Sequence, residues 1–479
     1  MAAGGVTLVE LRVLEGPNLY FPRPAIKLTL AVPGWLTLPE DRFARLADRI
    51  GDGGRAGRPG SEQRRRAVAR VVTQLTHRLA SAADVRLAVR GRRGAGEGQV
   101  VVAYPWRRRG AAEALGHEVA ALLGAVLDGR RSPERAFAEA AARLARAEPG
   151  EEPSVPDPSI PVIQVTGTNG KTTTVRLLAH LVRSAGRRVA YSSTDGVFRD
   201  DGVLVEAGDY SGFGGAARAL AQEPDVAVLE TARGGILLRG IGVLHNDVAV
   251  VTNVSEDHLG LHGIDTLDQL AEVKASITRI TRPEGWTVLN ADDPRVLAMR
   301  RGATGRPWVC SIHPGHPAIR ETLAERGRAS IVLDGWITVL ERSDARPLVR
   351  LEDVPVTIAG VSTPNTRNAL EAASAALAIG LPERAVARGL RTFVLDPERN
   401  PGRANLFGWN GRIVVIDYAH NEAGMEGLVE LCHGLRRSGR EIWLAICAAG
   451  DRTDAILHAF AYRAARGSDH LAIAELLHY

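Results

Sequence analysis

The residues best suited to chemistry lie in one glycine-rich segment, Gly167-Thr-Asn-Gly-Lys-Thr-Thr173. An apolar run that predicts a strand precedes it, and a segment of helical periodicity begins at Lys171. Glycines let backbone N–H groups approach phosphates closely, and a helix N-terminus favours negative charge. We therefore predict a phosphate-binding loop, although Val165 stands where the general pattern has its first glycine. The expected nucleotide contacts of this loop are Gly167, Thr168, Asn169, Gly170, Lys171, Thr172 and Thr173.

A buried strand ending in a carboxylate is predicted by Asp225-Val-Ala-Val-Leu-Glu230. The carboxyl ends of parallel strands face the nucleotide crevice in open α/β sheets. Glu230 could therefore supply an oxygen ligand to Mg²⁺, as could the Thr172 hydroxyl. Taken alone, an acid at the end of a strand is weak evidence, because many such acids only cap the following turn.

A second strand runs into the polar loop that contains His258. His258 and His262 have the i, i+4 spacing of a helical zinc site, but neither a cysteine nor an H-E-x-x-H pattern supports zinc. A GTPase would carry Asn-Lys-x-Asp after such a strand, and Thr252-Asn-Val-Ser255 does not supply it. Guanine specificity is therefore not expected.

Lysine is scarce, since only Lys27, Lys171 and Lys274 occur among the 60 basic residues. Arginine has been used where a positive charge suffices. A retained lysine indicates a position that requires a primary amine, either as a compact charge on phosphate or as a group open to covalent modification. Chance retention is the alternative.

The elements that would position these residues fall into four parts. Residues 1–148 alternate strands and helices as an α+β module, and prolines punctuate a linker at 149–160. Residues 161–401 alternate apolar strands with helices, which predicts a parallel sheet covered on both faces. Residues 402–479 repeat that alternation in a shorter, Rossmann-like form. Expected segments are strands 6–14, 26–32, 84–92, 98–106, 160–166, 188–193, 225–230, 247–253, 285–290, 412–417, 441–447 and 469–473, and helices 64–83, 111–128, 134–147, 171–184, 366–379, 422–436 and 453–465.

The composition, with 45% hydrophobic and 24% charged residues, is that of an ordinary soluble protein. No apolar run of about 18 residues and no signal-peptide pattern is seen, so no membrane span is expected. Three distant cysteines favour a reducing cytoplasm over a disulfide framework. The first 150 residues carry net positive charge, which suits an acidic polymer or nucleic acid, or forms only a solvated face.

Taken in order, these motifs resemble the Mur ligase family, most closely its cyanophycin-synthetase-like group. The resemblance covers roughly residues 160–452 and extends to residues 11–18. Compared with that group, an ATP-grasp domain is absent between the linker and the phosphate loop. The matching segments are the loop at 167–173, Ser193-Thr-Asp-Gly196, 229–237, Thr252-Asn253, Asp257-His258-Leu-Gly260, Lys274, Leu289-Asn-Ala-Asp-Asp-Pro294, Asn365-Thr-Arg-Asn368, Arg403-Ala-Asn-Leu-Phe407, Asp417-Tyr-Ala-His-Asn421 and Gly450-Asp-Arg452.

The resemblance implies a role for each candidate residue. Catalytic roles fall to Lys171, Lys274, His258 and Arg403. Thr172 and Glu230 would serve one Mg²⁺, and His258 and Lys274 a second, with Lys274 as its carbamate. Asn290 would contact adenine, while Arg403 and Asp417 would reach the γ-phosphate and the ribose. His420, Asp451 and Arg452 would lie near the incoming amino acid.

The implied function is that of an ATP-dependent ligase, which adds an amino acid to a peptide or polymer carboxylate through an acyl phosphate. The alternatives are a ligase acting on folate or on a UDP-MurNAc-peptide, and a nucleotide-binding scaffold that has lost ligation. No nucleic-acid partner is expected, and a homo-oligomer is possible. Because residues 403–479 hold only three predicted strands, we expect the last domain to be truncated and weakly protected. Cover of its exposed strand edge by a partner chain is the alternative.

Overall fold

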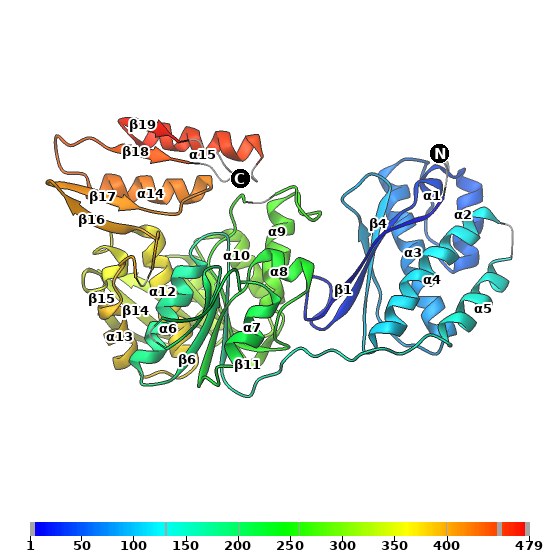
Figure 1. The fold of residues 1–479 in the computed structure, drawn as a ribbon, viewed down its shortest axis with the longest axis horizontal. Helices are drawn as coiled ribbons and strands as arrows, with labels where there is room; N and C mark the ends of the chain where they lie inside the picture. The colour runs from blue at the N-terminus through cyan, green and yellow to red at the C-terminus, as the bar shows by residue number, and fades with distance from the viewer. Residues whose placement is uncertain are drawn as a thin grey trace. The chain divides into compact units, whose positions relative to one another are not determined.

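A computed structural model describes residues 5–129, 132–200, 202–257, 259–398, 400–447 and 453–474 (Figure 1). The chain divides into two compact units. Unit 1 comprises Met1–Pro156, Ile236–Leu244 and His262–Ile264; unit 2 comprises Asp157–Gly235, His245–Leu261 and Asp265–Tyr479.

Unit 1 is built on a four-stranded antiparallel sheet of order β1-β2-β4-β3. The predicted strand at 84–92 is wrong in its extent, because Asp84 adopts a positive φ and the strand begins only at Arg90. The strands are β1 (Thr7–Leu14), β2 (Ala25–Ala31), β3 (Arg90–Arg93) and β4 (Gln99–Pro105).

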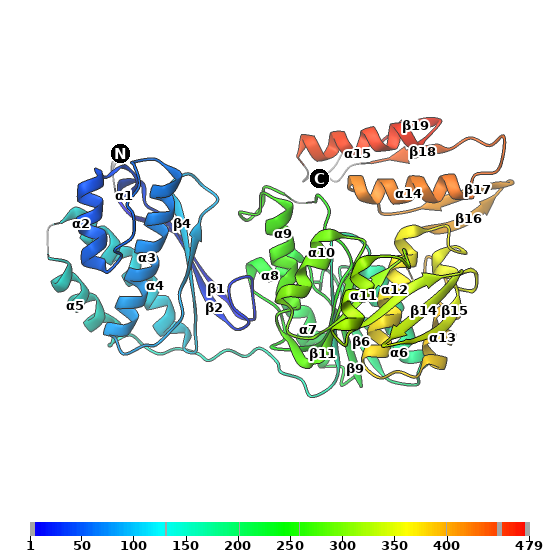
Figure 2. The ribbon, with the colours of Figure 1, turned by 180° about the vertical axis from the view of Figure 1, so that it is seen from behind.

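Helices cover one face of this sheet, as seen from behind in Figure 2. Apolar side chains of the helices and the sheet form the core of unit 1. Two of the helices, α1 and α2, were not predicted. Arg64 of α3 is fully buried and donates hydrogen bonds to the carbonyl oxygens of Leu38 and Gly57, which ties the loop after α2 to the core. The helices are α1 (Pro33–Thr37), α2 (Glu40–Ile50), α3 (Glu62–Ala82), α4 (Arg109–Asp128) and α5 (Pro133–Leu144).

Among the described residues, α4 is long and apolar enough to span a membrane by length and composition, contrary to the expectation from the sequence. In the structure its apolar face contributes to the core of unit 1 through Leu115, Val119, Leu122, Leu123 and Val126. Those contacts are the ordinary role of a core helix.

Unit 2 contains an eleven-stranded sheet of order β15-β14-β13-β12-β11-β10-β5-β9-β6-β7-β8. Its seven central strands, from β13 to β6, are parallel, as predicted for this part of the chain. Its strands are β5 (Val162–Thr166), β6 (Val189–Ser193), β7 (Gly196–Arg199), β8 (Val203–Ala207), β9 (Val226–Glu230), β10 (Asn246–Val251), β11 (Thr281–Asn290), β12 (Arg306–Ser311), β13 (Arg328–Leu333), β14 (Trp336–Glu341) and β15 (Asp344–Arg350).

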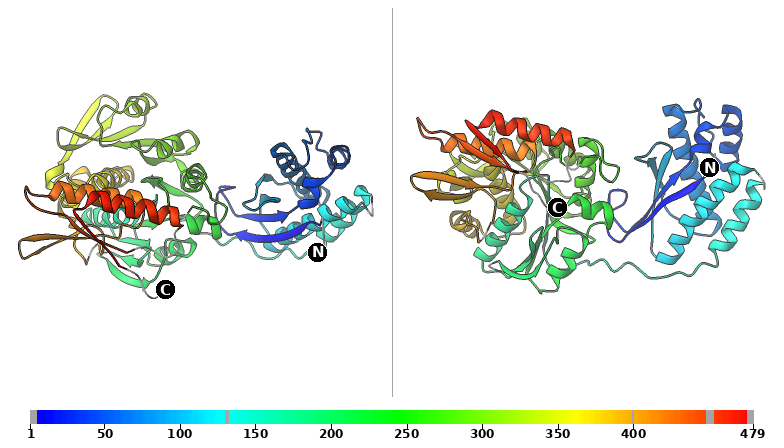
Figure 3. Two further views of the ribbon diagram at one scale, coloured as in Figure 1. Left: turned by 90° about the horizontal axis from the view of Figure 1, so that it is seen from above. Right: turned by 45° about the horizontal axis from the view of Figure 1, so that its top comes forward.

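Side chains on both faces of this sheet are buried. Alternate residues of β12 illustrate this, because Trp308 and Cys310 join one core cluster and Val309 joins another. The helices are α6 (Lys171–Ser184), α7 (Phe213–Leu220), α8 (Arg233–Leu238), α9 (Leu267–Lys274), α10 (Pro294–Ala298), α11 (Pro317–Ala324), α12 (Thr363–Ala378) and α13 (Glu383–Thr392). Two further views show the layers (Figure 3).

The last part of unit 2 holds two separate two-stranded sheets. The β16–β17 hairpin is antiparallel, whereas β18 and β19 are parallel and α15 connects them. Strand β16 was not predicted, and its partner β17 is the strand expected at 412–417. The elements are β16 (Asn405–Trp409), β17 (Arg412–Ile416), α14 (Glu422–Leu435), β18 (Trp443–Ile446), α15 (Asp454–Gly467) and β19 (His470–Ile473).

Candidate active site

The glycine-rich loop joins β5 to α6, and two of its glycines are required by their surroundings. A Cβ added to Gly167 would overlap the hydroxyl of Thr252, and one added to Gly170 would overlap the amide oxygen of Asn368. Gly170 also has a φ of 84°, a left-handed conformation that favours glycine. The backbone therefore turns sharply into α6, whose first-turn N–H groups have no partners within the helix.

The loop is held by the residues that follow β10. Asn253 accepts a hydrogen bond from the N–H of Asn169 through its side-chain oxygen, and its carbonyl accepts one from the N–H of Thr168. Thr252 and Asn253 both donate to the carbonyl oxygen of Asn169. The N–H groups of Thr168 and Asn169 are thus engaged within the protein, which leaves the first turn of α6 as the amide source for a phosphate.

Two of the three lysines meet at this loop. Lys171 Nζ donates to the Thr168 carbonyl oxygen at 2.8 Å, and Lys274 Nζ donates to the Gly167 carbonyl oxygen at 2.6 Å. Burial lowers the pKa of Lys274 well below its ordinary value, and the charge of Lys171 lowers it further. Burial also lowers the pKa of Lys171, while Glu230 opposes that change.

The Thr172 hydroxyl donates to Glu230 Oε2 at 2.9 Å. Glu230 is 2% exposed, and its other carboxylate oxygen is buried with no hydrogen-bond partner in the described structure. Burial raises the pKa of Glu230, and the neighbouring Lys171 ammonium opposes that rise. A buried carboxylate oxygen without a partner beside a hydroxyl fits an oxygen-seeking cation such as Mg²⁺.

Asn290 lies at the end of β11, and its side chain is engaged on both sides. Its Nδ2 donates to the Thr252 carbonyl oxygen at 2.8 Å, and its Oδ1 accepts from the N–H of Asp292. The side chain is 4% exposed. In this structure Asn290 positions the segment after β10, and an adenine contact by Asn290 stays a prediction.

Arg403 and Asp417 lie at the two ends of the β16–β17 hairpin. The Asp417 carboxylate accepts a hydrogen bond from the N–H of Ala404 at 2.7 Å, and the Arg403 guanidinium lies 5.0 Å from the centre of the Tyr418 ring. Burial raises the pKa of Asp417, whereas the Arg403 charge opposes that rise. The charge of Arg403 also lowers the pKa of Lys171, so Arg403 acts electrostatically on the phosphate loop.

The segment after Asp417 also contacts the loop region. His420 Nε2 lies 3.5 Å from the carboxylate of Asp257, and its Nδ1 lies 2.8 Å from the Tyr418 carbonyl oxygen. The predicted residues His258, Asp451 and Arg452 lie outside the described residues.

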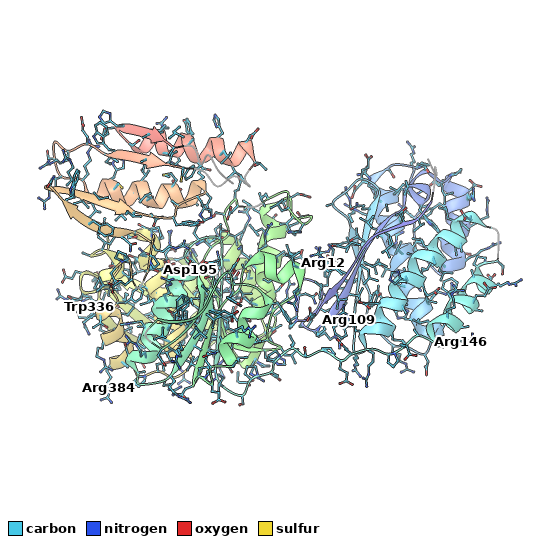
Figure 4. The ribbon with its side chains drawn as sticks, in the orientation of Figure 1. Arg12, Arg109, Arg146, Asp195, Trp336 and Arg384 are labelled. Atoms are coloured by element: carbon cyan, nitrogen blue, oxygen red, sulfur yellow. The ribbon has the colours of Figure 1, made fainter. Side chains whose placement is uncertain are left out.

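Three asparagines of this site were quoted as motif residues without a role. Asn253 holds the loop backbone, Asn368 faces Gly170, and Asn421 pairs with Asn169. Their partners are distant in sequence, so no local signal identifies these roles. Asp195, labelled in Figure 4, follows β6 and pairs with the buried Arg176 at 2.8 Å.

Comparisons with known proteins show what this site is similar to. Residues 165–375 match the model of the Mur ligase middle domain. Cyanophycin synthetase of Synechocystis sp. is 40% identical over 328 residues, which are 67% of this chain and 37% of that protein. UDP-N-acetylmuramoylalanine–D-glutamate ligase of Thermoanaerobacter sp. is 28% identical over 233 residues, 49% of this chain and 44% of that protein.

A solved structure described as "E.coli FolC in complex with DHPP and ADP" has a TM-score of 0.49 and 22% identity, covering 66% of this chain and 74% of that one. The chain spans little more than a third of the cyanophycin synthetases that it matches. The phosphate loop, Glu230, Lys274 and Asn290 all lie within the residues that match the Mur ligase middle domain, in a chain that is similar in sequence to cyanophycin synthetase.

Proposed function

We propose that this chain is an ATP-dependent carboxylate–amine ligase that adds an amino acid to a peptide or polymer acceptor in the cytoplasm. The observation that carries the proposal is the meeting of Thr172 and Glu230 at 2.9 Å, beside a loop that binds both Lys171 and Lys274. A hydroxyl, a carboxylate and two amines around a phosphate loop suit phosphoryl transfer, in which positioning and charge stabilisation do most of the work.

The proposed reaction has two steps. The acceptor carboxylate attacks the γ-phosphorus of ATP, so that a carboxyl O–P bond forms, the bond to the β-phosphate oxygen breaks, and ADP leaves. The amine of the amino acid then attacks the acyl carbon, the C–O bond to phosphate breaks, and the amine gives up a proton as the amide forms. Both steps spread negative charge over oxygens, which Lys171 and Arg403 would stabilise.

Magnesium would neutralise phosphate charge at this site. Thr172 and Glu230 would hold it. One buried carboxylate oxygen of Glu230 has no hydrogen-bond partner in the described structure, which suits coordination of a cation. A second ion, with Lys274 as its carbamate, is also proposed. Its support is the burial of Lys274 and the lowered pKa of its amine, since an uncharged amine is the form that reacts with CO₂.

Arg403 and Asp417 would act from the last part of unit 2. The hydrogen bond from Ala404 N–H to Asp417 fixes the turn that carries Arg403. We propose that this turn closes on ATP, so that water is excluded from the acyl phosphate.

The acceptor would bind unit 1. Arg93, in the edge strand β3, lines three hollows of about 250, 390 and 480 Å³ in this unit. Arg92 lines the two larger ones. Two arginines on an exposed sheet edge between hollows suit a chain that carries carboxylates.

The experiment is a measurement of ADP release from ATP with each candidate amino acid, in the presence and absence of an aspartate-rich peptide acceptor. A ligase releases ADP only when both substrates are present, whereas a scaffold releases none. Ligation of folate or of a UDP-MurNAc-peptide instead would identify the alternative substrate classes. The variant Arg92→Glu/Arg93→Glu should raise the KM for the acceptor and leave the KM for ATP unchanged. An unchanged acceptor KM would contradict the role of unit 1.

A further inference from the structure

Asn169 of the phosphate loop and Asn421 of the last part of unit 2 form a reciprocal pair of amide hydrogen bonds. Asn169 Nδ2 donates to Asn421 Oδ1 at 3.0 Å, and Asn421 Nδ2 donates to Asn169 Oδ1 at 3.0 Å. The two residues are 252 positions apart in sequence. Each amide therefore uses both its donor and its acceptor on the other, an arrangement that an aspartate cannot reproduce at either position.

Both asparagines are anchored by their own segments. Asn421 is fully buried and caps α14, since its Oδ1 also accepts the N–H of Gly424 at 2.9 Å. The backbone of Asn169 is bound on both sides by Thr252 and Asn253. A displacement of α14 therefore has to break the amide pair or pull on the phosphate loop.

Helix α14 packs closely against the start of α12 and the residue Val361 before it. A Cβ added to Gly427 would overlap Pro364, and a Cβ added to Gly434 would overlap Val361. Glycine within a helix costs about 1 kcal/mol relative to alanine, so two glycines on the packed face favour close approach over helix stability. The position of α14 along α12 is thus set by shape, which brings its cap to the loop.

We propose that the Asn169–Asn421 pair is a latch, which fixes the position of the phosphate loop relative to the segment that carries Arg403 and Asp417. Asn421 is then a positioning residue, because it acts through Asn169 and does not itself touch the substrate. The consequence for turnover rests on the proposed function, whereas the latch itself can be measured by hydrogen exchange without nucleotide.

The test separates the latch from the helix cap. Asn421→Asp keeps an oxygen that can cap α14 and accept from Asn169 Nδ2, but it cannot donate to Asn169 Oδ1. Asn169→Ala removes the other half of the pair. Hydrogen exchange of peptides from 403–435 is measured in the nucleotide-free full chain for both variants and for the double variant.

We expect Asn421→Asp and Asn169→Ala each to accelerate exchange in this segment about tenfold, and the double variant to add less than twofold to the faster single variant. Effects that multiply in the double variant would overturn the latch, as would exchange unchanged by Asn421→Asp.

Steady-state kinetics distinguish a positioning role from a merely structural one, because only a positioning role changes kcat without changing the KM for ATP. With a latch, Asn421→Asp lowers kcat about tenfold and changes the KM for ATP less than twofold, and circular dichroism stays that of the wild type. A rise in the KM for ATP as large as the fall in kcat would overturn the positioning role, and so would a wild-type kcat. If the wild-type chain releases no ADP with any acceptor, the proposed function fails while the exchange result stands.

Discussion

The Thr172 hydroxyl lies 2.9 Å from the Glu230 carboxylate because two neighbouring parallel strands end together. Val165 of β5 is paired with Glu230 of β9 in the sheet, so the loop after β5 passes directly over the end of β9. The register of one strand pair thereby places the first turn of α6 beside a buried acid.

Glu230→Gln should leave the fold intact and weaken the Mg²⁺ dependence of turnover. The amide keeps the shape and can still accept from Thr172, but it lacks the negative charge that a cation needs. The concentration of Mg²⁺ that gives half-maximal ADP release should rise at least about tenfold. An unchanged Mg²⁺ requirement would remove Glu230 from the metal site.

Lys171→Ala should abolish ATP turnover while the circular dichroism spectrum stays that of the wild type. Among the described residues the Lys171 amine donates only to the Thr168 carbonyl oxygen, so its loss removes charge at the phosphate loop and little packing. Arg188→Ala is the matched control, since Arg188 pairs with Asp225 on the surface. Wild-type ADP release by Lys171→Ala would contradict the phosphate assignment.

Lys274→Arg should be nearly inactive although it keeps a positive charge. A guanidinium cannot form a carbamate, and it is larger than the amine that now lies 2.6 Å from the Gly167 carbonyl oxygen. Lys27→Arg, in the partly buried pair with Glu10, should retain turnover. With ¹³C-bicarbonate, the wild type should give a carbamate NMR signal that Lys274→Arg lacks; a signal present in both proteins would exclude Lys274.

Glu371 should make unit 2 less stable as pH rises. It is fully buried in α12, both its carboxylate oxygens lack hydrogen-bond partners in the described structure, and burial raises its pKa well above the ordinary value. The folded state then keeps a proton that the unfolded state releases above pH 4.5, so stability is greatest below that pH and falls as pH rises towards the folded pKa.

Glu371→Gln should remove that dependence, which amounts to at most about 1.4 kcal/mol per pH unit. Urea unfolding at pH 6 and pH 8 measures it, with the surface variant Glu352→Gln as control. A pH dependence identical to that of the wild type would show that Glu371 finds a partner when ionised.

The β16–β17 segment (405–416) and the β18–β19 segment (443–447 with 453–473) should exchange amide hydrogens faster than the large sheet. Both contain two-stranded sheets, and Trp409, Ile413 and Trp443 are more than half exposed. Few buried contacts protect such strands. Uniformly high protection across these segments would show that they are stabilised as well as the central sheet.

The sequence predicted the phosphate loop and the central parallel strands because their signals are local. A glycine turn between a strand and a helix is recognisable within ten residues, and β5, β9 and β10 are continuous apolar runs. The extension of the sheet through β12 to β15 was missed, because β15 contains Pro347 and exposed charged residues that resemble a loop.

The asparagine contacts could not be predicted for a different reason. Asparagine side-chain contacts leave no periodic pattern in the sequence, because the tertiary fold determines the partner of each amide. Asn290 illustrates this, since a residue assigned to adenine by resemblance binds the carbonyl oxygen of Thr252 in the structure. The division into the four predicted parts stays a prediction.

The scarcity of lysine gives this chain natural reporters of local opening. A protease that cleaves only after lysine has three sites, and those at Lys171 and Lys274 lie in helices around the phosphate loop. Cleavage there requires the surrounding backbone to unfold first. The rate at which the native chain is cut at these two bonds therefore records how often the site opens, without any label or substitution.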